Sequence, residues 1–175
     1  MKIISSKEIT RNRIFTVAEE HAVDPSGFEI HRSIVHHRGS AVMMPVDEKK
    51  RILLVRQFRL PAKRYLWELP AGTLDPGEKP LQTAKRELVE ETGYRAKKWR
   101  KIAEFYPSVG FLDEKMTIYL ATELTAGEAK PMDDERIQTR WFTAKEVEAM
   151  LQTRKVMDAK TNIGFFRWKE YFAGK

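Results

Sequence analysis

The segment 80–92 constrains the fold of this chain more than any other, because it has the start, the stop and the length of a helix. It begins with a proline, which suits the first turn, and it is followed by Gly93, which can take the left-handed conformation that ends a helix. Glu87, Glu90 and Glu91 are spaced i, i+3 and i+4, so they share one helix face. Like charges at this spacing repel one another. The sequence therefore predicts a helix whose acidic face requires a cation.

A hard divalent cation is one candidate for that partner. Magnesium prefers carboxylate oxygens, keeps several waters and shares the rest of its shell with substrate phosphate. The preceding strand stops at Pro70-Ala71-Gly72, so a backbone carbonyl near Ala71 could join the carboxylates. Arg86 carries a positive charge, but it neighbours Glu87 in sequence and is expected to point elsewhere on the helix. The competing interpretation is a solvated acidic face, which is the usual role of glutamates on a helix.

The rest of the chain alternates strands with a few helices. Apolar runs at 41–46 and 52–55, joined by the polar link 47–51, predict a hairpin in a sheet buried on both faces. Thr143-Ala144-Lys145-Glu146 is a capping box that predicts a helix as far as Leu151. Together these elements indicate an α/β layer fold with a mixed sheet. The other predicted elements are strands at 14–17, 28–35, 67–70, 102–105, 116–122 and 140–142, and a last helix over 158–172.

Composition narrows the class of protein. A length of 175 residues, with 42% apolar and 33% charged residues, indicates one folded domain, with a second only if it is small. The absence of cysteine excludes thiol catalysis, disulfides and thiolate zinc sites. A net charge of +7 suggests an anionic partner such as a nucleotide. No targeting segment and no run of 18 apolar residues is present, so a soluble, cytoplasmic protein without membrane contact is expected.

The stretch from Gly72 to Tyr94 resembles the Nudix box, G-x5-E-x7-R-E-U-x-E-E-x-G-U, where U is a bulky apolar residue. Seven fixed matches occur by chance in about 10⁻⁸ of windows. The resemblance implies an α/β/α sandwich with a mixed sheet over residues 41–175, preceded by an N-terminal β region over 1–40. The fixed positions are filled by Gly72, Glu78, Arg86, Glu87, Glu90, Glu91 and Gly93.

The resemblance also implies roles for these residues. Glu87 and Glu91 would be the principal magnesium ligands and catalytic carboxylates, with Glu90 contributing and Ala71 offering its carbonyl. Manganese could replace magnesium.

The other fixed positions would build the framework of the box. Arg86 and Glu78 would hold the loop against the helix through a salt bridge, and Gly72 and Gly93 would allow close backbone approach.

A second resemblance concerns the substrate. Arg56-Gln57-Phe58-Arg59, then the segment 68–72 and the box, resemble the ADP-ribose pyrophosphatase branch, which has a proline downstream like Pro107. The implied reaction is magnesium-dependent hydrolysis of a nucleoside diphosphate sugar to two phosphate monoesters. In the loop 108–114, Val109 stands where the branch usually has proline, which leaves nucleotide sugars other than ADP-ribose open.

The branch places a further catalytic carboxylate in a late loop, here 132–137. Glu135 is the first candidate, Asp133 the second, and Glu114, at the substrate side, the third; the alternative is a solvated acidic loop. Arg59 could bind the diphosphate bidentately, or be a surface charge.

The resemblance also bears on base recognition and on assembly. Phe28 could stack on the base, although core packing is the commoner role of aromatics. The branch commonly forms homodimers through its N-terminal strands, so residues 1–40 are a candidate dimerisation arm.

Three alternatives stay open. The basic cluster 95–101, with Trp99, could contact RNA, which would favour a hydrolase of nucleoside triphosphates or capped RNA ends. A solvated strand edge protected by lysines is the expected explanation, and nucleic acid is not the expected partner. A non-catalytic nucleotide-binding module is the third functional class that stays open.

His36-His37 does not predict zinc, because adjacent strand residues point to opposite faces.

Overall fold

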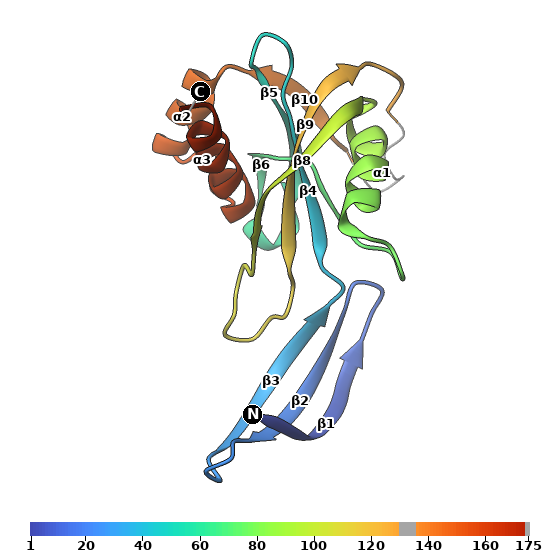
Figure 1. Ribbon diagram of the computed structural model, residues 1–175, viewed down its shortest axis with the longest axis vertical. Helices are drawn as coiled ribbons and strands as arrows, with labels where there is room; N and C mark the ends of the chain where they lie inside the picture. The colour runs from blue at the N-terminus through green and yellow to red at the C-terminus, as the bar shows by residue number, and fades with distance from the viewer. Residues whose placement is uncertain (130–135, 174–175) are drawn as a thin grey trace.

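The protein is described by a computed structural model over residues 1–129 and 136–173. An α/β body carries a separate three-stranded sheet that extends from one end of it (Figure 1). No helix within these two stretches of chain is both long and apolar enough to cross a membrane.

A four-stranded mixed sheet forms the centre of the body. Its order is β7 (Ala71–Thr73), β4 (Ser40–Pro45), β9 (Met116–Thr125) and β8 (Arg95–Phe105). β4 runs parallel to β9, and the other two pairs are antiparallel. Every residue of β4 is buried, as expected of a strand covered on both faces. The predicted mixed sheet is therefore confirmed.

A second sheet has the order β10 (Gln138–Phe142), β5 (Ile52–Arg59) and β6 (Arg64–Glu68). The predicted hairpin between the two apolar runs is wrong, because β4 and β5 belong to different sheets and meet only at an isolated bridge between Val46 and Ile52. Each of the two strands is central in its own sheet, so both of its hydrogen-bonding edges are already filled by other strands.

Helices cover both faces of the central sheet (Figure 1). α1 (Pro80–Thr92) packs on one face, while α2 (Ala144–Gln152) and α3 (Ala159–Ala173) lie on the other side of the body. The bounds predicted for the first helix are confirmed. Gly93 ends it with φ of 74° and donates its N–H to the Val89 carbonyl at 2.8 Å.

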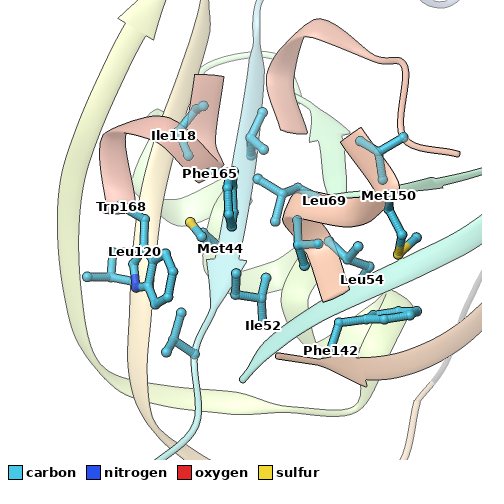
Figure 2. Close-up of a cluster of buried hydrophobic side chains, with 14 residues drawn as sticks. Met44, Ile52, Leu54, Leu69, Ile118, Leu120, Phe142, Met150, Phe165 and Trp168 are labelled. Carbon is cyan, nitrogen blue, oxygen red and sulfur yellow. The ribbon is translucent and has the colours of Figure 1, made fainter. Parts of the chain in front are cut away.

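The alternation of side chains along β4 connects the two helical layers. Ala41 and Met43 pack with Leu88 of α1, whereas Val42 and Met44 join the larger cluster under α3. Figure 2 shows this larger cluster, in which Phe165 and Trp168 of α3 meet Met44, Ile118 and Leu120. Each fully buried large apolar side chain contributes about 1.5–3 kcal/mol. The core thus holds α1 and its acidic residues against a rigid sheet.

The N-terminal sheet is an antiparallel meander of β1 (Lys2–Arg11), β2 (Phe15–Val23) and β3 (Glu29–His37). It meets the body through the loop that precedes β9. Val35 and Leu112 form a parallel bridge, and Asp113 accepts from the His37 N–H at 2.6 Å and contacts His36 Nδ1 at 2.7 Å. β1 is exposed along its whole length.

Candidate active site

Edge strand β7 and helix α1 bring the predicted site together. Gly72 lies directly against Glu87, since a Cβ built on Gly72 would meet the Glu87 Cδ at 2.0 Å and Oε1 at 2.1 Å. Only a residue without a side chain leaves the carboxylate in this place. The glycine that opens the box therefore makes the seat for one of its glutamates.

The Ala71 carbonyl faces the free edge of β7. Met43 donates its N–H to the Pro70 carbonyl at 2.9 Å, and Leu74 donates to the carbonyl of Gly39 at 3.0 Å. Hydrogen-bonded and non-hydrogen-bonded pairs alternate along an antiparallel ladder, so Ala71 falls in a pair whose carbonyl points away from β4. The Thr73 carbonyl has the same direction, and Arg86 of α1 reaches it at 3.5 Å. The carbonyl of Ala71 thus points to the side where Arg86 and its carboxylate partners lie.

The three glutamates of α1 differ in exposure. Glu91 is buried, with 4% of its surface exposed, while the side chains of Glu87 and Glu90 are 15% and 37% exposed. A carboxylate is retained in a protein interior only with cations or strong donors around it. Glu91 is therefore the carboxylate whose charge most needs compensation from its surroundings.

Arg86 lies among the acidic side chains, and the expectation that it points away from them is wrong. Its Nη1 donates to Glu87 Oε1 at 2.6 Å and to Glu90 Oε2 at 3.0 Å, while Nε and Nη2 hold Glu78 at 3.1 and 2.9 Å. The arginine side chain is long enough to extend along the helix as far as Glu90, at position i+4. The ion pair with Glu78 that the resemblance implied is present.

The guanidinium bridges Glu87 and Glu90 through its Nη1, at the place a cation would occupy. Among the described residues, the ligand oxygens of Glu87, Glu90 and Glu91 do not gather within 4.8 Å of one another. A divalent cation would have to take over Glu87 and Glu90 from Arg86 Nη1. The two bonds from Arg86 to Glu78 would still anchor the arginine.

Glu78 ties the turn before α1 to the helix. Hydrogen bonds from Arg86 lower the pKa of Glu78 to about 2, with further help from the Thr83 hydroxyl at 2.7 Å and the Asp75 N–H at 3.1 Å. Because the folded state holds the ionised form, this contribution to stability is complete above the ordinary pKa of 4.5 and is lost as the pH falls through about 2.

We therefore expect the free energy of unfolding to fall between pH 4.5 and 2, and Glu78→Gln to reduce that dependence. The measurement is the urea midpoint against pH for both proteins. The glutamine variant should be less stable at pH 7 and should approach the parent near pH 2. Parallel curves over this range would contradict the role given to Glu78.

A second charged network lies behind the site. Arg59 donates Nε and Nη2 to the two oxygens of buried Glu68 at 2.7 and 2.9 Å, and Lys160 of α3 binds the same carboxylate. Burial acts to lower the pKa of Arg59, but the hydrogen bonds and charge of Glu68 outweigh it, and the charges of Glu91 and Asp158 add to the rise. Arg59 therefore stays cationic within the field of Glu91.

Two further predicted residues, Glu114 and Phe28, lie in other parts of the described chain than α1. Glu114, in the loop before β9, lies beside the first residue of β4, where its Oε1 accepts a hydrogen bond from the Ser40 hydroxyl at 2.5 Å. Phe28 is 62% exposed in the turn between β2 and β3. This turn lies at the end of the molecule far from α1 (Figure 1). Asp133 and Glu135 lie outside the described residues.

Lys160 and Asp158 were not predicted from the sequence. Lys160 is buried and joins Glu68, which lies 92 residues earlier, and it contacts Asp158 Oδ1 at 3.0 Å. No local pattern marks such a pair. The one available signal was an ionisable residue, Glu68, between the apolar residues of the segment 67–70.

Comparisons with known proteins agree with this architecture. A family model described as the NUDIX domain matches residues 35–162. An ADP-ribose pyrophosphatase of Bacillus subtilis is 40% identical over 92% of this chain and 91% of its own length, and a methanol dehydrogenase activator of Bacillus methanolicus is 33% identical over 93% and 89%. A crystal structure of an ADP compounds hydrolase superposes with a TM-score of 0.83 at 21% identity, covering 99% of this chain and 96% of that one.

Proposed function

We propose that this chain, which belongs to the Nudix hydrolase family, hydrolyses the diphosphate bond of ADP-ribose or a related nucleoside diphosphate sugar with the help of magnesium. The observation that carries the proposal is the arrangement around Arg86, where a complete Nudix box places Glu87 and Glu90 on one nitrogen with Glu91 buried beside them. The products would be two phosphate monoesters.

The residues present suit a hard divalent cation. Glu87 and Glu91 would hold it, with Glu90 and the Ala71 carbonyl contributing, and all four offer oxygen, the donor that magnesium and manganese prefer. Gly72 leaves the space that the Glu87 carboxylate occupies. When bound, magnesium would offset the charge of the diphosphate, polarise its phosphoryl oxygens and activate water.

The protein's own side chains would hold and orient the substrate. Glu68 fixes two donors of Arg59, so the guanidinium is already oriented, and its Nη1 edge is the part we propose for the diphosphate. Glu135, or Asp133 in its place, would take the proton from the attacking water. Arg86 would be the counter-ion that keeps the carboxylates ionised and in place before metal arrives.

ADP-ribose is proposed as substrate for two reasons. The sequence has the pattern of the ADP-ribose pyrophosphatase branch, and the Bacillus subtilis relative, which aligns over 91% of its length, is named ADP-ribose pyrophosphatase. Val109, which departs from the branch pattern, is 82% exposed in the loop that ends at Glu114. Exposure leaves this position free to contact a ligand. The sugar moiety is therefore the part of the substrate that the proposal specifies least.

A substrate panel tests the proposal. The protein is incubated with magnesium and, separately, ADP-ribose, GDP-mannose, ATP and capped RNA, and nucleoside monophosphate is measured. Cleavage of ADP-ribose or GDP-mannose ahead of the other two is expected. Turnover of ATP or capped RNA alone would favour the other hydrolase classes, and tight binding of ADP-ribose without turnover would favour a binding module.

We further propose that residues 1–40 form the arm of a homodimer. β1 is an edge strand that exposes three isoleucines, Ile3, Ile4 and Ile9, each more than half exposed. Exposed apolar groups on an unpaired strand edge are typical of a surface that another chain covers. Phe28 lies far from α1 of its own chain, so a role in stacking on the substrate base would require the site of a second copy. The proposed compartment remains the cytoplasm, as the sequence predicts.

The double variant Ile3→Lys/Ile9→Lys is expected to convert a dimer into a monomer, because charged groups would enter the interface. Light scattering after gel filtration should give twice the chain mass of 20.4 kDa for the parent and the chain mass for the variant. Lys7→Gln, at an exposed polar position on the same strand, is the matched control and should stay dimeric. A monomeric parent would contradict the arm.

A further inference from the structure

Two histidines face each other across the N-terminal sheet. His21 of β2 is paired with His31 of β3 in the strand register, and their rings stack at 4.1 Å between centroids with 13° between planes. Directly opposed residues of an antiparallel pair point to the same face of the sheet. The pair was invisible in the sequence, because its members are ten positions apart across a turn.

Glu29 supplies a third donor on the same face. It lies two residues before His31, so its side chain leaves the strand in the same direction. Its Oε2 is 3.1 Å from His21 Nε2 and 3.6 Å from His31 Nε2. One oxygen thus lies against both ring nitrogens, and the ligand atoms of all three residues lie within 4.8 Å of one another.

Two imidazoles and one carboxylate form a donor set for zinc rather than magnesium. Zinc binds imidazole nitrogen at about 2.0–2.1 Å in tetrahedral geometry, which places neighbouring ligand atoms about 3.4 Å apart. Side-chain rotations that move the ligand atoms by about an ångström would close the group to that spacing. The His31 and Glu29 side chains are free to make them, because they are 68% and 57% exposed. Their exposure also leaves a fourth position for water.

We propose that His21, His31 and Glu29 bind one zinc ion. The ion would tie β2 to β3 beside the turn 24–28 and so brace the end of the hairpin that carries Phe28. His36 and His37 differ, because their rings contact Asp113 and Glu114 in the loop before β9. The zinc site is separate from α1 and does not depend on the proposed hydrolysis.

Zinc binding by the full chain tests this assignment. Protein freed of metal with a chelator is dialysed against graded zinc chloride in excess magnesium, and bound zinc is measured by mass spectrometry. His21→Gln and His31→Gln remove one nitrogen ligand each. Glu19→Gln, an exposed change on the same strand, is the matched control, and Glu91→Gln reports any zinc held at α1.

One zinc per chain is expected for the parent, the Glu19→Gln variant and the Glu91→Gln variant. Loss of one of three ligands should weaken binding at least about tenfold in each histidine variant. Cobalt in place of zinc should give the visible absorption of a tetrahedral ion in the parent and not in the histidine variants. Unchanged zinc binding in the histidine variants, loss of the zinc only in Glu91→Gln, or no zinc retained by the parent at 100 µM would each overturn the proposal.

Discussion

Replacement of Glu91 by glutamine is expected to lower kcat for ADP-ribose by about 10²–10³-fold. The substitution keeps the shape of a side chain that is 4% exposed and removes only its charge. Metal-ion catalysis contributes several kcal/mol, and each 1.4 kcal/mol corresponds to about tenfold in rate. Loss of a principal ligand should therefore reduce turnover far more than it reduces folding.

Two measurements separate this effect from misfolding. In chelator, the urea midpoint of Glu91→Gln should match or exceed that of the parent, because a buried neutral amide costs less than a buried charge. Added magnesium should raise the melting temperature of the parent and not of the variant. Glu90→Gln is the matched comparison and should lose less activity, since its side chain is more exposed. Equal turnover by Glu91→Gln and the parent would refute the assigned role.

Gly72→Ala is expected to lower activity by at least about 10²-fold while the protein stays folded. The new methyl group would occupy the place of the Glu87 carboxylate, which lies 2.0 Å from the added Cβ. The carboxylate terminates a flexible side chain and can move aside at small cost, but it then leaves its position. A displacement of about 1 Å at a site can cost about 10²-fold in rate.

A double-mutant cycle tests whether the glycine acts through Glu87. Glu87→Ala removes the atoms that the methyl group would displace, so Gly72→Ala should add no further loss of kcat in that background. Thermal melting of all three variants shows whether each is folded. Additive losses in the double variant would mean that Gly72 matters for another reason.

Local signals were sufficient to predict α1. A proline start, a glycine end and the spacing of glutamates are all contained within the helix and its flanks. Pairing of β4 was not predictable in this way, because its neighbour β9 lies about 70 residues later in the chain. The strand 102–105 and the strand edge expected at 95–101 are joined in one edge strand, β8, which the separate local patterns did not reveal.

The site shows the same division between local and distant information. The box predicted the ligand set and the ion pair between Arg86 and Glu78 through its resemblance. The prediction for Arg86 considered only its adjacency to Glu87 and overlooked Glu90, which lies at i+4 and therefore on the same side of the helix. Lys160 became visible only when α3 packed behind Glu68.

The central claim, cleavage of a diphosphate bond by the α1 site, is tested most directly by phosphorus NMR. ADP-ribose, magnesium and the full chain are mixed, and the spectrum is followed with time beside samples containing chelator or Glu91→Gln. The account predicts that the two diphosphate resonances of the parent sample are replaced by two monoester resonances, with no change in the other samples. Diphosphate resonances that persist with folded, magnesium-bound protein, or that disappear equally with Glu91→Gln, would contradict it.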